Sequence, residues 1–509
     1  MLGRDKVCAV VAAPDARSMR TQLRRALRHT RTAELRLDWL RDDAEIVRFV
    51  RLLARLRPRA TMIATCRRRE AGGRYRGTIA KQLVHLADAI QAGCEWYDFE
   101  IETLRKCPRE LVDVVLGDAR QLASAHFFDR IPKSLPRVAA ELTSYKPRAI
   151  KIAAHCDSLA QARSLLNFGR KHRNIVAIPM GDVGLPARFL ALRARNGFAY
   201  APVERATAPG QISLDEMMRV YRADRFDART QVYGVIGNPV GHSLSPAMQN
   251  AGFAARRINA VYLPFLVRDL KDFLASVEPL GIGGFSVTLP HKEKILGVLD
   301  GCDPLAEKIG AVNTVIARAR GQLFGYNTDY VGVLRSLERR IPLRGSRVLI
   351  VGAGGAARAV AFALAQADSS VCICARRAAR AKLLARAVGG EAIARAHLRR
   401  EFFDAIVNAT PVGMHPRAAE SPLAANELNC RLVFDTIYRP RKTRLLRLAE
   451  QRGIETVSGL EMFVAQGTAQ WEIWTGERAP VAAMRRAVED ALAREENSAG
   501  ASGKKRKTP

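Results

Sequence analysis

Lys151 is the residue of this chain whose chemistry follows most directly from its neighbours. It lies in the run Ala149–Ala154, AIKIAA, in which all the remaining residues are Ala or Ile. Burying an ammonium group is costly unless the group is paired or functional, because it loses its hydration. The same desolvation lowers the pKa of an amine, and a neutral amine attacks ketones to form Schiff bases. The run therefore predicts a catalytic nucleophile at Lys151.

Other polar residues interrupt or follow apolar runs in the same half of the chain. Apolar patterning alone would not place charged or hydrogen-bonding side chains at these positions, so each one is a candidate site residue. They are Glu34, Arg36, Arg67, His126, Arg188 and the loop Thr207–Gln211, TAPGQ.

The elements that must position these residues repeat one pattern. Up to about Val220, short apolar runs alternate with helical segments rich in Leu, Ala and Arg. This alternation favours a parallel sheet, and eight repeats predict a closed (β/α)8 barrel over residues 1–225. Active sites of that fold lie where strands end and the following loops begin. The predicted strands are Lys6–Ala12, Ala33–Trp39, Ala60–Cys66, Trp96–Ile101, Ala119–Ala125, Ala149–Ala154, Asn174–Pro179 and Phe198–Val203.

These residues resemble the motifs of the type I 3-dehydroquinate dehydratase family. The similar segments are the ELR strand Glu34–Arg36, the S-x-H segment Ser124–His126, the KIA lysine Lys151 and the lid Thr207–Gln211. The resemblance implies that Lys151 forms an imine with the ketone of 3-dehydroquinate, and that His126 acts as general base and later as acid. It further implies that the substrate is bound by Glu34, Arg36, Arg67, Arg188, Thr207 and Gln211.

Two positions depart from the family pattern. The family usually has Glu before the paired glycines that follow its strand-three arginine, whereas this chain has Ala71 there and Glu70 one position earlier. If that carboxylate orients His126, the shift leaves the partner of the imidazole open. Thr207 replaces the serine of the family's lid and keeps the hydroxyl group.

A glycine-rich turn in the second half joins an apolar strand to a helix within Arg347–Ala365. Strand, turn and helix in this order are the context of a dinucleotide fingerprint, in which the pyrophosphate lies at the helix N-terminus. The next strand, Val371–Ala375, ends without the Asp or Glu that binds a ribose 2′-hydroxyl, and arginines follow it, which favours NADP(H) over NAD(H). The predicted cofactor-binding residues are Gly352, Ala353, Gly354, Gly355, Ala356, Arg376, Arg377 and Arg380.

Four segments of the second half, taken in order, resemble the shikimate dehydrogenase family. They are GVIGNPVGHSLSP (Gly234–Pro246), GFSVTLPHK (Gly284–Lys292), GYNTD (Gly325–Asp329) and VGAGGAARA (Val351–Ala359). Hydride delivery to a ketone requires a proton donor, and the candidate is Lys292, with Asp329 beside it. The resemblance implies that shikimate is bound by Ser243, Ser245, Ser286, Thr288, Asn313, Tyr438 and Gln466, and that Thr410 and Gly459 border the cofactor.

The two resemblances predict a bifunctional enzyme that dehydrates 3-dehydroquinate to 3-dehydroshikimate and reduces this product to shikimate with NADPH. Its second half would be discontinuous, with an α/β substrate domain at residues 230–330 rejoined by 457–493. A Rossmann cofactor domain would occupy 331–456. The last helix is expected to finish near Ala493, leaving 494–509 as a disordered basic tail.

Composition limits the classes of partner and of cellular compartment to be expected for this chain. The net charge is +32, but the arginines are spread over nearly every predicted helix, which argues against a specific nucleic-acid site. We find no signal peptide and no apolar run of membrane length. The nine cysteines lack metal-ligand spacing, so we expect no metal site and a reducing, cytoplasmic compartment.

Alternatives from other classes remain open at this stage. The chain could be a binding or regulatory protein that has lost one activity, for which the shifted carboxylate near Ala71 is the only indication. The dehydrogenase half could act on quinate, although Ser243 and Ser245 favour shikimate. A nucleic-acid-binding protein would show no turnover and a steep loss of binding with salt. No feature of the sequence sets the oligomeric state.

Overall fold

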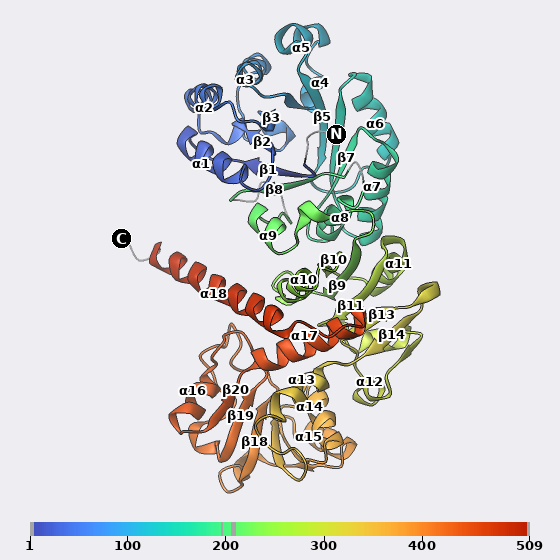
Figure 1. Cartoon of the computed structure of the whole chain (residues 1–509), viewed down its shortest axis with the longest axis vertical. Helices are drawn as coiled ribbons and strands as arrows, with labels where there is room; N and C mark the ends of the chain where they lie inside the picture. The colour runs from blue at the N-terminus through green and yellow to red at the C-terminus, as the bar shows by residue number, and fades with distance from the viewer. Residues whose placement is uncertain (1–4, 195–196, 205–209, 506–509) are drawn as a thin grey trace. The chain divides into compact units, whose positions relative to one another are not determined.

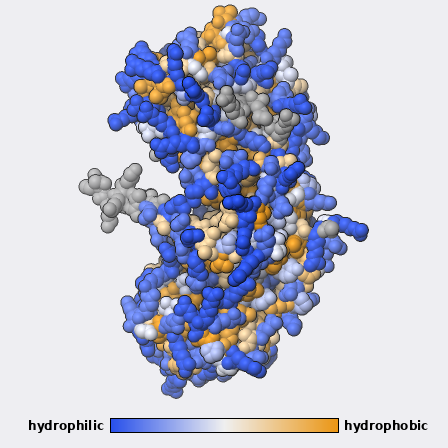
Figure 2. Space-filling view, viewed as in Figure 1, coloured by the Kyte–Doolittle hydropathy of each residue, from blue (hydrophilic) through white to orange (hydrophobic). Residues whose placement is uncertain are grey.

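The computed structural model describes residues 5–194, 197–204 and 210–505. By compactness the chain divides into two units, Met1–Val232 with Asn259–Gly281, and Tyr233–Ile258 with Ile282–Pro509. The described residues form three sheets (Figure 1). No helix among them is long and apolar enough to cross a membrane. Hydrophilic residues cover most of the face shown in Figure 2.

The first sheet is the predicted parallel barrel, with its strands surrounded by helices (Figure 1). All eight predicted strands are confirmed, with ends shifted by at most three residues. The strands are β1 (Val7–Val11), β2 (Thr32–Arg36), β3 (Thr61–Thr65), β4 (Trp96–Glu100), β5 (Arg120–Phe127), β6 (Ala149–His155), β7 (Ile175–Met180) and β8 (Ala199–Pro202). The helices are α1 (Ala16–Ala26), α2 (Asp43–Leu56), α3 (Ile79–Gln91), α4 (Ile101–Leu104), α5 (Arg109–Leu116), α6 (Leu135–Ser144), α7 (Leu159–Lys171), α8 (Leu185–Ala191) and α9 (Leu214–Arg219).

The barrel departs from the prediction at one seam. Its strand order is β7-β6-β5-β4-β3-β2-β1-β8, so β7 and β8 are not paired within the described residues and the barrel is nearly rather than fully closed. β8 has four residues and ends at Pro202, which lacks a backbone donor. A short strand of this kind offers few hydrogen bonds to a second neighbour.

The second sheet has the order β10-β9-β11-β13-β14-β12. β13 is antiparallel to both β11 and β14, so the sheet of this α/β domain is mixed. The elements of this region are β9 (Gln231–Gly237), α10 (Ser245–Ala255), β10 (Ala260–Leu266), α11 (Leu270–Leu280), β11 (Ile282–Val287), β12 (Gly301–Cys302), α12 (Pro304–Ile309), β13 (Thr314–Ala317), β14 (Leu323–Tyr326) and α13 (Asp329–Leu337).

The third sheet is the predicted Rossmann sheet, parallel throughout in the order β17-β16-β15-β18-β19-β20. Its central strands are continuous apolar runs because both faces are buried. Its elements are β15 (Arg347–Val351), α14 (Gly355–Gln366), β16 (Ser370–Cys374), α15 (Ala378–Ala387), β17 (Glu391–Ala392), β18 (Phe403–Asn408), β19 (Cys430–Asp435), α16 (Arg444–Gln451) and β20 (Glu455–Val457).

Two helices, α17 (Gly459–Thr475) and α18 (Val481–Lys505), end the described chain. The prediction that the last helix stops near Ala493 is wrong, because α18 runs to Lys505. Met484, Val488 and Leu492 are buried at one-turn spacing and anchor its first half. The Ala, Arg and Glu residues that follow are strong helix formers, and Pro509 is the only proline of this segment, so the helix propagates beyond its anchored part.

Two adjacent phenylalanines at the start of β18 test the packing of the Rossmann sheet. Phe403 is fully buried, whereas Phe402 is 48% exposed. Phe403→Ala should lower the free energy of unfolding by about 3–5 kcal/mol through lost contacts and a cavity. The matched variant Phe402→Ala should lower it by less than about 1 kcal/mol. Urea unfolding measures both, and equal losses would contradict this packing.

Candidate active sites

Lys151 lies inside the barrel between two carboxylates. Its Nζ is 3.3 Å from Glu34 Oε1 and forms a second, closer ion pair with Asp98. The three residues come from β6, β2 and β4, and the Lys151 side chain is only 3% exposed. The ammonium group is therefore buried, as its apolar neighbours indicated, but it is paired rather than isolated.

Asp98 connects this pair to the rest of the site. Arg67 Nη2 lies 3.2 Å from its carboxylate, and the Ser124 hydroxyl donates a 2.6 Å hydrogen bond to it. Burial alone would raise the pKa of Asp98, but the positive charges of Lys151 and Arg67 hold it well below its usual range. Asp98 is thus a carboxylate at all physiological pH values and a fixed partner for both cations.

The other barrel residues named from the sequence also face this group or its rim. Glu34 accepts a 3.0 Å hydrogen bond from the Thr65 hydroxyl. Arg36 donates to both oxygens of Asp38, at 2.9 and 2.8 Å. Burial opposes the charge of Arg36, but the Asp38 carboxylate outweighs it and raises the pKa of the guanidinium.

His126 is the penultimate residue of β5, two positions beyond Ser124. Burial, followed by the charges of Arg67 and Lys151, lowers the pKa of His126 well below its ordinary value. The imidazole is therefore neutral at pH 7 and able to accept a proton. Its Nδ1 is buried without a hydrogen-bond partner, and the ring stacks on Phe128 at a centroid distance of 6.1 Å.

The shifted carboxylate does not orient His126. Glu70 forms ion pairs with Arg68 at 3.2 Å and Lys106 at 2.9 Å, and its side chain is 52% exposed. Ala71, at the family's Glu position, is buried. Glu70 is a surface ion-pair residue, and it leaves the imidazole without a carboxylate from this loop.

The lid segment is described only in part. Thr207 lies outside the described residues, and Gln211 is half-buried. Arg188, on α8, donates a hydrogen bond to the carbonyl oxygen of Gly210, so it holds the backbone of the lid. Burial lowers the pKa of Arg188 to about 10.

In the second half, Lys292 and Asp329 meet as the two motifs predicted. Lys292 Nζ lies 2.7 Å from Asp329 Oδ2, and the lysine side chain is 30% exposed. Asn313 Nδ2 donates to Asp329 Oδ1 at 2.8 Å and to the Thr328 hydroxyl at 3.1 Å. The Asn313 amide therefore holds Asp329, so the carboxylate is fixed on one side while the lysine remains accessible.

The remaining residues predicted to bind shikimate are positioned by their own local contacts. Ser243 Oγ accepts from the Ser245 backbone N–H at 3.2 Å, and Ser286 Oγ donates to Gln470 Oε1 at 2.8 Å. Thr288 is half-buried directly after β11. Tyr438 stacks on Phe463 at 4.5 Å, and Gln466 Nε2 donates to the Phe463 carbonyl at 2.8 Å.

The glycine turn fits a dinucleotide. Gly352 has φ +123°, and a Cβ there would lie 3.0 Å from the Ala409 carbonyl oxygen, so only glycine suits this close approach. A Cβ at Gly354 or Gly355 would meet no atom within 4 Å, which leaves open space at the start of α14. No side chain caps α14, so its first N–H groups are available to an anion.

The residues that follow β16 are suited to binding a phosphate group. Arg376, Arg377 and Arg380 are exposed, and within the described part of the chain their guanidinium groups have no ion-pair partner. Thr410 bonds to Asn408 in the loop after β18, with Oγ1 at 2.7 Å from Asn408 Oδ1. A Cβ at Gly459 would lie 2.4 Å from the Thr436 carbonyl oxygen, so this glycine permits close packing of the chain at α17.

Sequence reasoning missed three groups that hold these sites. Asp98 and Gln470 were not named, and neither was the pair Asn408–Asp435, whose side chains lie 3.0 Å apart at the ends of β18 and β19. A signal existed for Asp98, since two acids alternate along the strand Trp96–Ile101, WYDFEI. Gln470 lies within a long helix, where its spacing gives no comparable signal.

Comparison with protein families divides the chain in the same order as the sheets. The description "Type I 3-dehydroquinase" matches residues 7–227, and "Shikimate dehydrogenase substrate binding domain" matches 235–315. "Shikimate / quinate 5-dehydrogenase" matches 336–441, and "Shikimate 5'-dehydrogenase C-terminal domain" matches 459–489.

Individual proteins give the same result. A bifunctional 3-dehydroquinate dehydratase/shikimate dehydrogenase of Arabidopsis thaliana, labelled chloroplastic, is 33% identical over 88% of this chain and 78% of its own. A shikimate dehydrogenase (NADP(+)) of Thermococcus kodakarensis is 45% identical over 52% of this chain and 97% of its own. A crystal structure of a shikimate dehydrogenase in complex with NADP+ matches at 38% identity with a TM-score of 0.50, covering 52% of this chain and 96% of that one.

Asp435 gives the second half a predicted pH dependence of stability. It accepts hydrogen bonds from Asn408, Thr443 and the Ile437 N–H, but burial outweighs them and raises its pKa to about 6, from 3.8. The folded state then binds more protons than the unfolded state between these pH values. The contribution of this group to stability is therefore present below pH 4 and lost as pH rises through about 6.

The loss amounts to about 3 kcal/mol at most, for a shift of about two units. Asp435→Asn does not titrate, so the unfolding free energy of the wild type relative to this variant should fall between pH 4 and pH 7. Urea unfolding at several pH values measures the difference. A difference that stays constant with pH would contradict the raised pKa.

Proposed function

The chain belongs to the family of bifunctional 3-dehydroquinate dehydratase/shikimate dehydrogenase proteins, and from this premise we propose how its own residues carry the two reactions. It dehydrates 3-dehydroquinate to 3-dehydroshikimate and reduces this product to shikimate with NADPH. The observation that carries the first assignment is the lysine buried between two carboxylates, with a neutral imidazole on the neighbouring strand.

In the barrel, Lys151 attacks the ketone carbon of 3-dehydroquinate, and loss of water gives a protonated imine. The attack requires the ammonium to lose a proton, and Glu34, whose Oε1 lies 3.3 Å from the Lys151 Nζ, is the acceptor within reach, because Asp98 stays ionised. The iminium ion withdraws electrons and acidifies the adjacent C–H. His126 removes that proton, then returns it to the departing hydroxyl group, which leaves as water. Hydrolysis of the imine releases 3-dehydroshikimate and restores Lys151.

The arginines bind the substrate in this scheme. A guanidinium group offers paired donors to a carboxylate, a geometry that suits the acidic substrate. Among the described residues, the buried Nε atoms of Arg67 and Arg188 have no hydrogen-bond partner, which supports a role in binding. The ion pair with Asp38 fixes the orientation of the Arg36 guanidinium group.

In the second half, Lys292 donates the proton to the ketone oxygen of 3-dehydroshikimate as hydride reaches its carbon. Asp329 holds the ammonium group, and Asn313 fixes Asp329 in turn. Bound NADPH supplies the hydride. The turn at Gly352 and the uncapped α14 would hold its pyrophosphate, and Arg376, Arg377 and Arg380 its 2′-phosphate.

The domain boundaries that suit this division are a barrel at 1–225, a substrate domain at 230–330 rejoined by 457–493, and a cofactor domain at 331–456. We place the protein in the cytoplasm. The support for this location is that all nine cysteines are unpaired, as expected in a reducing compartment.

Substitutions of Lys151 and Lys292 should separate the dehydratase activity from the dehydrogenase activity. Lys151→Arg should lower turnover of 3-dehydroquinate by at least about a thousandfold, because a guanidinium group keeps the charge but is not a nucleophile. Reduction of 3-dehydroshikimate should stay within about twofold of the wild type. A coupled assay with NADPH, started with either substrate, measures both. Dehydration that survives in Lys151→Arg would refute the imine assignment.

Lys292→Met should give the reverse pattern. It should convert 3-dehydroquinate at the wild-type rate and accumulate 3-dehydroshikimate, with NADPH consumption reduced by about a hundredfold or more. The conjugated product is followed by its ultraviolet absorbance. Loss of dehydration in this variant would mean that the two sites are not separate as proposed.

The arginines after β16 set the preference for NADP. Changing Arg376, Arg377 and Arg380 together to Ser should raise KM for NADP by about tenfold or more and leave KM for NAD almost unchanged, because only NADP carries the 2′-phosphate. Arg386→Ser, at the other end of α15, is the matched control and should change neither constant. Equal increases for both cofactors would place the 2′-phosphate elsewhere.

A further inference from the structure

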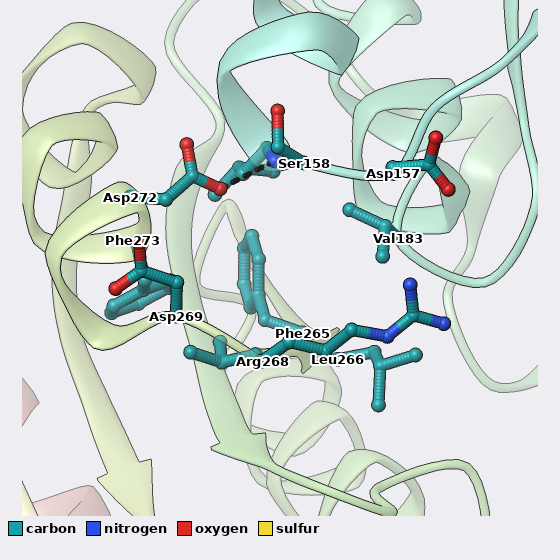
Figure 3. A pocket seen from close by; sticks show the side chains of 11 residues that line it. Asp157, Ser158, Val183, Phe265, Leu266, Arg268, Asp269, Asp272 and Phe273 are labelled. Carbon is teal, nitrogen blue, oxygen red and sulfur yellow. Dashed lines mark hydrogen bonds between the residues drawn. The ribbon is translucent and has the colours of Figure 1, made fainter. Parts of the chain in front are cut away.

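The segment β10–α11 forms one compact unit with the barrel, although it follows the barrel in sequence. Asp272 of α11 reaches the first residues of α7. Its Oδ2 accepts from the Leu159 N–H at 2.6 Å (Figure 3), and its Oδ1 accepts from the Ala160 N–H at 3.0 Å. The Ser158 hydroxyl caps the next donor, Gln161 N–H, at 3.2 Å. Two of the unpaired donors that begin every helix are thus satisfied by a carboxylate from α11.

The contact is reciprocal. Arg163 of α7 donates to the Ala275 carbonyl oxygen at 2.7 Å and contacts the Ser276 hydroxyl at 3.4 Å. Arg193, just after α8, donates to the Leu280 carbonyl at 3.0 Å. Cationic side chains at the carbonyl end of a helix and a carboxylate at the amino end of another are the favourable arrangements for both helices. The segment is therefore fixed to α7 at several points.

The loop held by Asp272 adjoins the barrel site. β6 carries Lys151 and ends at His155, and the Cys156 N–H donates to the Met180 carbonyl at 3.2 Å. The His155 ring packs on Gly181, where a Cβ would lie 2.8 Å from His155 Cε1. The β6–α7 loop therefore supports the β7–α8 loop.

The β7–α8 loop in turn contacts Gly210. A Cβ at Gly210 would lie 2.5 Å from the Gly181 carbonyl oxygen, and Arg188 donates to the Gly210 carbonyl. Direct contacts thus run from Asp272 through two loops to the backbone of Gly210.

A cavity of about 260 Å³ lies on one side of this support. Figure 3 shows Ser158 and Val183 at its barrel wall, with Phe265 and Arg268 across from them. Side chains that line a cavity lack packing atoms on that side. On this side of the loop, the hydrogen bonds from Asp272 take the place of packing contacts.

We propose that Asp272 is a positioning residue for the dehydratase. By capping α7 it sets the β6–α7 loop and, through His155 and Gly181, the position of Gly210 and of Arg188, which bonds to Gly210. The proposal rests on the assignment of dehydration to the barrel. Under this proposal, the dehydration reaction depends on the Asp272 side chain, which comes from the segment that follows the barrel.

The test uses the full chain with Asp272→Asn, which keeps the shape of the side chain but turns an amide donor toward one of the two N–H groups. The matched control is Asp269→Asn, which removes the same charge three residues earlier on α11. Asp269 caps its own helix through the Lys271 N–H, and Asn is an equally good cap. Each variant is assayed for both reactions.

In Asp272→Asn, kcat/KM for 3-dehydroquinate should fall by about tenfold, mostly through a higher KM, because a shift of the β7–α8 loop displaces Arg188 and weakens binding. Both constants for 3-dehydroshikimate should stay within about twofold, and so should every constant of Asp269→Asn. Asp272→Glu, which keeps both acceptors, should recover part of the lost KM, a result that general destabilisation would not give.

Dehydratase constants that do not change in Asp272→Asn would overturn the proposal, and so would an equal fall in both activities. Wild-type protein that reduces 3-dehydroshikimate but does not convert 3-dehydroquinate would instead overturn the assignment on which the proposal rests. The two failures are therefore distinguishable in one set of assays.

Discussion

The ion pairs of Lys151 with Glu34 and Asp98 constrain the whole barrel. Buried charges are tolerated only when they are paired, and removing one partner costs several kcal/mol. The partners come from β2, β4 and β6, and the Tyr200 ring of β8 lies 4.8 Å from the ammonium, so four alternate strands contribute as in a barrel layer. A slip of any strand by one residue would turn its side chain outward and leave a buried charge unpaired. The site therefore fixes the register of the strands.

Lys151 and Lys292, the two lysines that we propose as catalytic, differ in burial and in the number of their carboxylate partners. Lys151 is 3% exposed and has two carboxylate partners, of which Asp98 stays ionised and Glu34, 3.3 Å away, is within reach of the proton that the ammonium must lose before it attacks a ketone. Lys292 is 30% exposed and has a single partner, Asp329. A proton donor to a transient alkoxide must exchange its proton with solvent after each turnover, and partial exposure allows this. Burial thus distinguishes a nucleophile from an acid although both are lysines beside carboxylates.

Local patterns in the sequence were sufficient for the barrel strands and the glycine turn, and they placed Lys151 inside a buried strand. They were not sufficient for pairings between distant segments. Asp98 lies 53 residues from Lys151, and only barrel closure brings the two together. The antiparallel pairing of β13 with β14 was not predicted, because short apolar runs do not specify strand direction. The length of α18 depended on anchoring by Met484, Val488 and Leu492, a tertiary contact that compositional cues to disorder do not include.

The central claim is that the buried Lys151 forms the covalent bond to substrate, and reductive trapping tests it most directly. Protein treated with borohydride in the presence of 3-dehydroquinate should lose dehydratase activity and gain one stable adduct. Peptide mass spectrometry should locate that adduct on Lys151, and activity with 3-dehydroshikimate should remain. An adduct on another lysine, or full dehydratase activity after treatment with no adduct, would contradict the account.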